Sequence, residues 1–259
     1  MGMNRNSAIA LYDSGRGVES VLKVCQKLLP HEKWLILQDN DSPYGSKSDQ
    51  EIIDRGFSCF TKILQRDVKA IVVACHTSSA IAMSSLSRHF SVPMVGMLRP
   101  TARLLAECHT TDNLIWLATP ASVKADRLEP LARQLGYRGQ FFAVACDQWV
   151  DCIENNQLDR LEVLLQSFAH EYGDLIYNRG AKIIYGCTHY PLLEGLFNRV
   201  FGDRCVSIDP ATAVGNALKY QLMQNDMLRM DKSPSVKFLD GMAFQWSDCL
   251  ALKWSDCLA

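Results

Sequence analysis

Two cysteines, Cys75 and Cys187, occupy nearly matching positions in the sequence, and their chemistry is its clearest functional signal. Each ends an apolar run rich in Ile and Val, AIVVAC and AKIIYGC, and each is followed by a His and a Thr in swapped order. Such runs are typical of strands buried on both faces of a parallel sheet. Because ligands in open α/β sheets bind outside the carboxyl ends of the strands, both thiols are expected at a binding site.

Two thiols that face each other across a cleft can act on opposite sides of one substrate. One thiolate would remove a proton while one thiol donates a proton to the other face, and the two would exchange roles between directions. An ordinary thiol has a pKa of about 8.5 and is mostly protonated at neutral pH, so the base needs a neighbouring group that helps it to ionise. This pairing suits a reaction whose substrate and product are mirror images.

Composition excludes several other classes of protein. The chain has 259 residues, 48% of them hydrophobic, and a formal net charge of −1, so we expect no attraction to nucleic acid or to anionic membranes. No apolar run approaches the roughly 20 residues that span a bilayer, and the N-terminus lacks the features of a signal peptide. The ten cysteines are scattered without a CxxC pair, which argues against zinc and disulfides alike. These features predict a cytoplasmic protein.

Strand and helix patterns alternate along the chain. Strands are predicted at 7–12, 34–37, 70–74, 93–97, 113–118, 140–144, 182–185 and 205–208, and helices at 18–29, 49–65, 78–89, 123–135, 158–178, 192–200 and 211–224. Alternation of this kind predicts an α/β fold with parallel sheets, arranged as two similar domains.

The motifs DSGRG (13–17), PYGSKS (43–48), IVVACHTSSA (71–80), ATPASVK (118–124) and GCTHYPLLE (186–194) occur in this order. Together they resemble the glutamate racemases, which are cofactor-independent members of the aspartate/glutamate racemase superfamily. The resemblance extends to about residue 224. It implies two α/β domains facing a central cleft, with residues 1–98 and 209–259 in the first and 99–208 in the second. It also implies a cytosolic enzyme whose product, D-glutamate, feeds peptidoglycan synthesis, and it is compatible with a homodimer.

The resemblance also implies individual roles. Cys75 and Cys187 would be the acid and base, Asp13 and His189 their assistants, and Glu154 the acid that supports the His. Residues expected to bind the amino-acid substrate are Ser14, Pro43, Tyr44, Gly45, His76, Thr77, Ser122 and Thr188. No Lys lies in a recognisable pyridoxal-phosphate setting and no metal constellation is present, so we expect neither cofactor nor metal. The carbanion would then be stabilised by a polar, preorganised cleft that excludes water.

His76 departs from the family pattern, in which Cys is followed by Asn. A His could alter the substrate preference, act as an additional acid or base, or impair turnover. An aspartate or broad-specificity amino-acid racemase therefore stays open, as does a non-catalytic amino-acid-binding relative. Taken alone, the DSGRG segment could be a turn that leads into a helix, and His189 could be a hydrogen-bonded core residue.

The C-terminus carries a duplication, in which WSDCLA occurs at 246–251 and again at 254–259. Its apolar residues suit a short helix, but the repeat is too short for a solenoid and we assign it no function.

Overall fold

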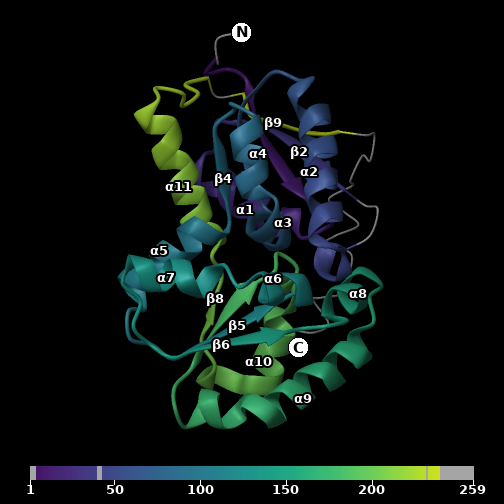
Figure 1. The fold of residues 1–259 in the computed structure, drawn as a ribbon, viewed down its shortest axis with the longest axis vertical. Helices are drawn as coiled ribbons and strands as arrows, with labels where there is room; N and C mark the ends of the chain where they lie inside the picture. The colour runs from purple at the N-terminus through teal and green to yellow at the C-terminus, as the bar shows by residue number, and fades with distance from the viewer. Residues whose placement is uncertain (1–3, 40–42, 232, 240–259) are drawn as a thin grey trace.

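The computed structural model describes residues 4–39, 43–231 and 233–239, and the C-terminal duplication lies outside them. Two parallel sheets lie one above the other, with helices around each (Figure 1). All the strand pairs in both sheets are parallel, which confirms the predicted α/β fold class. Among the described residues, no helix is long and apolar enough to cross a membrane.

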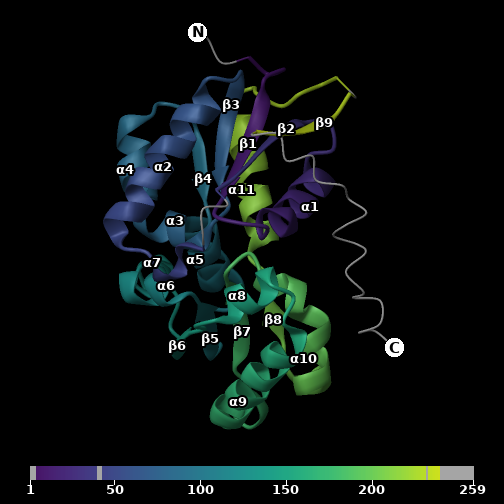
Figure 2. The same cartoon turned by 90° about the vertical axis from the view of Figure 1, so that its right-hand side faces the viewer.

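The first sheet has the strand order β4-β3-β1-β2-β9. Its strands are β1 (Ala8–Asp13), β2 (Lys33–Gln38), β3 (Val68–Val73), β4 (Met94–Gly96) and β9 (Ser235–Phe238). Helices near it are α1 (Val18–Leu28), α2 (Asp49–Leu64), α3 (His76–Ile81), α4 (Met83–His89) and α11 (Ala211–Gln224), with a short 3₁₀ turn, η1 (Tyr44–Ser46). Figure 2 shows α1 and α11 on one side of this sheet and α2 and α4 on the other.

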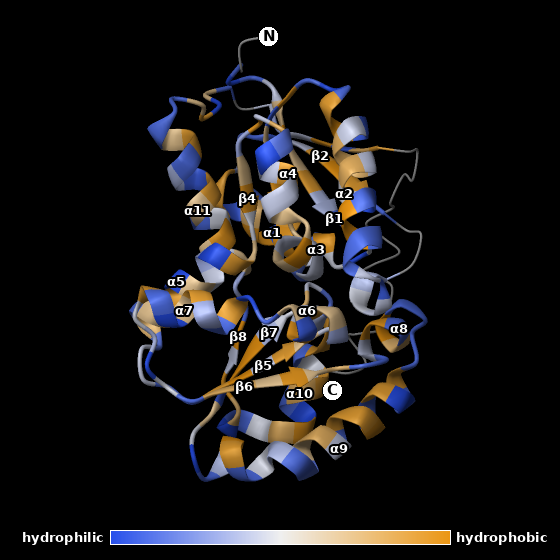
Figure 3. Ribbon diagram, viewed as in Figure 1, coloured by the Kyte–Doolittle hydropathy of each residue, from blue (hydrophilic) through white to orange (hydrophobic). Residues whose placement is uncertain are grey.

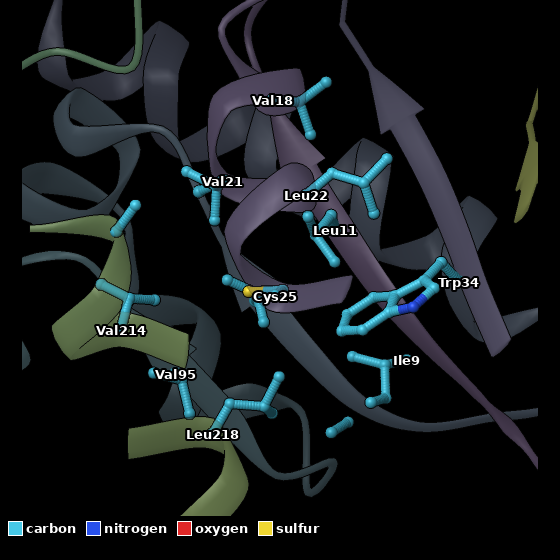
Figure 4. Close-up of a cluster of buried hydrophobic side chains, with 14 of the residues drawn as sticks. Ile9, Leu11, Val18, Val21, Leu22, Cys25, Trp34, Val95, Val214 and Leu218 are labelled. Carbon is cyan, nitrogen blue, oxygen red and sulfur yellow. The ribbon is translucent and has the colours of Figure 1, made fainter. Parts of the chain in front are cut away.

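Alternating side chains of β1 fill both faces of this sheet. Ile9 and Leu11 pack in a cluster with residues of α1 and α11, including Leu218, as the close-up in Figure 4 shows. Ala10 and Tyr12 pack on the opposite face against α2. This two-residue alternation with apolar side chains on both faces is why the run could be recognised as a doubly covered strand.

The second sheet has the order β6-β5-β7-β8. Its strands are β5 (Leu114–Ala118), β6 (Phe141–Ala145), β7 (Lys182–Gly186) and β8 (Ser207–Ile208). The helices around it are α5 (Leu98–Cys108), α6 (Pro120–Ala125), α7 (Leu128–Leu135), α8 (Trp149–Glu154), α9 (Leu158–Tyr177) and α10 (Glu194–Phe201), with 3₁₀ turns η2 (Tyr190–Leu193) and η3 (Gly202–Arg204). In Figure 3 the strands are mostly apolar, whereas α9 carries polar residues on its outer side.

The predicted elements are largely present, but several differ. The expected helix 78–89 is divided at Ala82 into α3 and α4. The expected helix 123–135 is divided at Asp126, whose backbone is left-handed, into α6 and α7. Helices α5 and α8 and strand β9 were not predicted. Strand β9 is short and only partly buried, so it carries little of the apolar pattern on which strand prediction depends.

The chain returns to the first sheet after β8. Helix α11 packs on α1, and β9 pairs with β2. This course agrees with a first domain made of residues 1–98 and 209–259 around a second of 99–208, and these bounds stay a prediction.

Candidate active site

One small cavity lies where the carboxyl ends of the strands in the two sheets meet. Its walls include residues one or two positions after the ends of β1, β3, β5 and β7. The lining residues are Asp13, Ser14, Pro43, Tyr44, Gly45, Cys75, His76, Thr77, Thr119, Val150, Cys187, Thr188 and His189. The cavity of about 20 Å³ has room for one or two water molecules and no more, so an amino acid could enter only if the walls move apart.

The structure brings the predicted site residues together. Eleven of the thirteen line the cavity, and the other two, Glu154 and Ser122, each hydrogen-bond to a residue that does. Thr119 and Val150 line the cavity but were not predicted. Thr119 could have been found, because a Thr before Pro at a strand end is the usual start of a helix, and its hydroxyl does accept the Ser122 N–H at the start of α6.

Cys75 lies at the start of α3, where its Sγ accepts the Ser78 N–H at 3.4 Å. The Ser14 hydroxyl lies 3.4 Å from the same sulfur. Burial, together with the nearby charge of Asp13, raises the pKa of the Cys75 thiol to about 11. Cys75 is therefore a protonated thiol at neutral pH.

Asp13 ends β1 and is buried. Its Oδ1 accepts the Ser14 N–H at 2.7 Å, and its Oδ2 accepts the Thr188 hydroxyl at 3.0 Å. Burial raises the pKa of Asp13 to about 6, although the charge of His189 opposes the rise. A carboxyl group with this pKa can gain or lose a proton near neutrality, as a proton acceptor for a neighbouring thiol must.

Cys187 and His189 form a second polar cluster with Glu154. The Cys187 Sγ lies 3.5 Å from His189 Nδ1, and His189 Nε2 lies 2.6 Å from Glu154 Oε1. Burial disfavours the imidazolium, but Cys187 and Glu154 outweigh this effect and raise the pKa of His189 to about 10. Glu154 also accepts the Arg16 N–H at 3.2 Å, which ties this cluster to the loop after β1.

Three hydroxyl groups join the two sheets at another side of the cavity. Thr77 Oγ1 lies 2.9 Å from Thr119 Oγ1 and 3.1 Å from Ser122 Oγ. Ser122 is fully buried behind the other two. Ser122 does not line the cavity, whereas its hydrogen-bond partners Thr77 and Thr119 do.

His76 is buried, and burial lowers its pKa to about 3. The ring is therefore neutral at physiological pH. Its Nδ1 is buried without a hydrogen-bond partner among the described residues. A neutral ring that lines the cavity argues against His76 as a cationic acid and favours an effect on substrate binding.

Comparisons with known proteins agree with this geometry. Residues 1–217 match the family model described as Asp/Glu/Hydantoin racemase. The chain belongs to this racemase family. It is 34% identical over 225 residues to the glutamate racemase of Roseiflexus sp., covering 85% of this chain and 81% of that one. It is 32% identical over 236 residues to the glutamate racemase of Methylococcus capsulatus, covering 88% and 84%.

The family's fold is also present. The crystal structure of the glutamate racemase isoform RacE1 from Bacillus anthracis superimposes with a TM-score of 0.82 at 25% identity, covering 91% of this chain and 88% of that one. The resemblance to this racemase family inferred from the motifs is thus confirmed, and the protein is an enzyme of an amino-acid racemase family.

Proposed function

We propose that this protein interconverts L- and D-glutamate by a two-cysteine acid/base mechanism. The observation that carries the proposal is that one cavity receives one thiol from each sheet, Cys75 beside the Ser14 hydroxyl and Cys187 beside the His189 ring. The relatives named above are glutamate racemases, which supports glutamate as the substrate. In this proposal the enzyme works in the cytosol and its D-glutamate supplies peptidoglycan synthesis.

The two thiols differ in their neighbours. Cys187 Sγ lies 3.5 Å from His189 Nδ1, and the raised pKa of His189 keeps its ring positively charged at neutral pH, whereas the raised pKa of Cys75 keeps that thiol protonated. In the proposed step Cys187 acts as the base and takes the α-proton that faces it, and Cys75 delivers its own proton to the opposite face of the carbanion. The products of this step are a Cys187 thiol, a Cys75 thiolate and the inverted amino acid.

In the opposite direction Cys75 must first lose its proton, and Cys187 must gain one, which the His189 imidazolium 3.5 Å away would supply. Ser14 lies between Cys75 and Asp13, with its hydroxyl 3.4 Å from the sulfur and 3.5 Å from Asp13 Oδ1. Asp13 is therefore placed to accept this proton through Ser14. The surrounding hydroxyl groups would bind the substrate's charged groups, and the 43–45 turn would bind its side-chain carboxylate.

Replacement of either cysteine tests the mechanism. Cys75→Ser and Cys187→Ser should each abolish racemisation, because each removes one of the two proton-transfer groups, worth about 10²–10⁴-fold apiece. Elimination of HX from a β-substituted analogue should survive in each variant for one enantiomer. Cys108→Ser is the control, since Cys108 is exposed and does not line the cavity. A Cys75 or Cys187 variant that racemises at close to the wild-type rate would contradict the proposal.

Substrate and cofactor are tested on the wild-type enzyme. Circular dichroism should show racemisation of glutamate but not of aspartate, and activity on both would favour the broad-specificity alternative. Inactivity on every common amino acid would favour a non-catalytic binding protein. We also expect activity to survive dialysis against EDTA, and loss of activity that zinc restores would contradict a cofactor-independent reaction.

A further inference from the structure

A chain of buried hydroxyl groups runs behind the 43–45 turn and ends on Asp39, a residue outside the cavity lining. The Tyr44 hydroxyl donates a short hydrogen bond to Asp39 Oδ2. The Tyr12 hydroxyl lies 2.9 Å from the Tyr44 hydroxyl, and the Ser78 hydroxyl donates to Tyr12 at 3.4 Å. Tyr44 lines the cavity, so this chain connects Asp39 to the wall of the site.

The direction of this chain can be assigned. Burial raises the pKa of both Tyr12 and Tyr44, so each phenol keeps its proton. Tyr44 uses its single O–H on Asp39, which leaves the Tyr44 oxygen to accept the O–H of Tyr12. Hydrogen bonds therefore run from Ser78 through Tyr12 and Tyr44 to Asp39, and Asp39 is the terminal acceptor on which the orientation of the others depends.

Asp39 is itself held from two sides. Its backbone N–H donates to the Asp13 carbonyl at 2.8 Å, which extends the pairing of β1 with β2 by one residue. Its Oδ2 pairs with Arg55 Nε of α2 at 3.3 Å, and both side chains are only partly exposed. The backbone of Asp39 is thus fixed by the sheet and its carboxylate by a helix, and the carboxylate accepts a hydrogen bond from Tyr44.

The 43–45 turn is also packed closely on the side away from this hydroxyl chain. A Cβ added at Gly45 would lie 3.2 Å from Thr119 Cβ in the other half of the molecule. The turn is therefore held on one side by Thr119, which packs against Gly45, and on the other by the Tyr44 side chain, which is bonded to Asp39. Small shifts of its backbone would change the position of any group that binds there.

We propose that Asp39 is a positioning residue which, through Tyr44, holds the backbone of the 43–45 turn where it binds the side-chain carboxylate of the substrate. This inference rests on the proposed function. It assigns to Asp39 an effect on substrate affinity and none on proton transfer at the thiols, because in the proposed function the turn binds the end of the substrate away from its α-carbon.

The test is a double-mutant cycle in steady-state racemisation of glutamate. Asp39→Ala should raise KM roughly tenfold or more with little change in kcat, as expected when a site loses a charge-assisted hydrogen bond. Tyr44→Phe should give a similar increase, and the double variant should be no worse than Tyr44→Phe alone because both changes break one path. Asp39→Asn keeps an oxygen for Tyr44 and should recover most of the affinity.

Asp54→Ala is the matched control, since Asp54 is an exposed carboxylate of α2 next to Arg55 and should leave KM unchanged. Melting temperatures of all variants separate a loss of affinity from unfolding. An unchanged KM in Asp39→Ala, or KM effects that add in the double variant, would overturn the inference. If wild type does not racemise glutamate, the proposed function itself fails, and this inference fails with it.

Discussion

Asp13 and His189 have pKa values displaced in the direction that each proposed role requires. The pKa of Asp13 is raised to about 6, so its carboxyl group is ionised above that pH and protonated below it. It can therefore accept a proton from Cys75 only above about pH 6. The pKa of His189 is raised to about 10. Its ring is therefore positively charged below that pH and loses this charge as the pH rises through it.

The pH profile of racemisation should reflect the ionisation of Asp13. The two enantiomers have equal free energies, so kcat/KM must be the same in both directions, and we expect it to fall in both as the pH drops through about 6. Initial rates from each enantiomer between pH 5 and 9 measure this profile. Asp13→Asn should remove the acid limb and slow racemisation by about 10²-fold or more. A wild-type profile without an acid limb near this pH would contradict the role of Asp13.

His76 is the residue most able to change substrate preference. Its neutral ring has a buried Nδ1 without a hydrogen-bond partner among the described residues, and a substrate in the cavity could supply one. We predict that His76→Asn keeps or raises kcat/KM for glutamate, because the smaller side chain leaves more room in a very small cavity. Kinetics on glutamate and aspartate check this. A fall of tenfold or more on glutamate would show that the enzyme depends on the His.

At the scale of elements, the start of α1 lies unusually close to the loop after β7. A Cβ added at Gly17 would lie 2.1 Å from Thr188 Oγ1 and 2.9 Å from His189 Nδ1. The Ser20 hydroxyl of α1 also donates to the Thr188 carbonyl at 2.9 Å. Thr188 and His189 therefore pack closely against the backbone at Gly17, and the Thr188 hydroxyl also donates to Asp13.

Gly17→Ala should therefore impair catalysis without unfolding the protein. Gly17 has a right-handed helical backbone that Ala tolerates, so the cost arises from the displaced loop and not from strain in α1. We expect kcat/KM to fall by about 10²-fold, as misplaced catalytic groups commonly cause. Gly173→Ala in the middle of α9 is the control, since its Cβ has ordinary contacts and the helix gains propensity. Equal activity in both variants would disprove the close contact.

At the scale of the whole molecule, the first half depends on a helix that arrives late in the chain. Leu218 of α11 is fully buried in one cluster with Ile9, Leu11 and Trp34. We predict that Leu218→Ala lowers the free energy of unfolding by about 2–5 kcal/mol, because it leaves a cavity in this core. Urea denaturation measures the loss, and Lys219→Ala, an exposed neighbour, is the control. An effect below about 1 kcal/mol would show that α11 contributes little to this core.

The sequence by itself determined the features that arise from short-range patterns. Short runs of consecutive apolar residues predicted the strands. The position of Cys75 and Cys187 just after two of these runs was sufficient to place both thiols at the carboxyl ends of the strands. This inference succeeded because all parallel strands of a sheet end at the same edge, whatever their order. The polar residues at these strand ends consequently came together without knowledge of the topology.

Only the tertiary structure decided the contacts that cross the cavity. Thr119 lies in the wall while Ser122 lies behind it, and Asp39 reaches Tyr44 from outside the site. The displaced pKa values of Asp13, His76 and His189 depend in the same way on burial and on charges from both halves of the chain. No local pattern encodes these relations, because hydrogen bonding and desolvation act over a few ångströms in space between residues that lie far apart in the sequence.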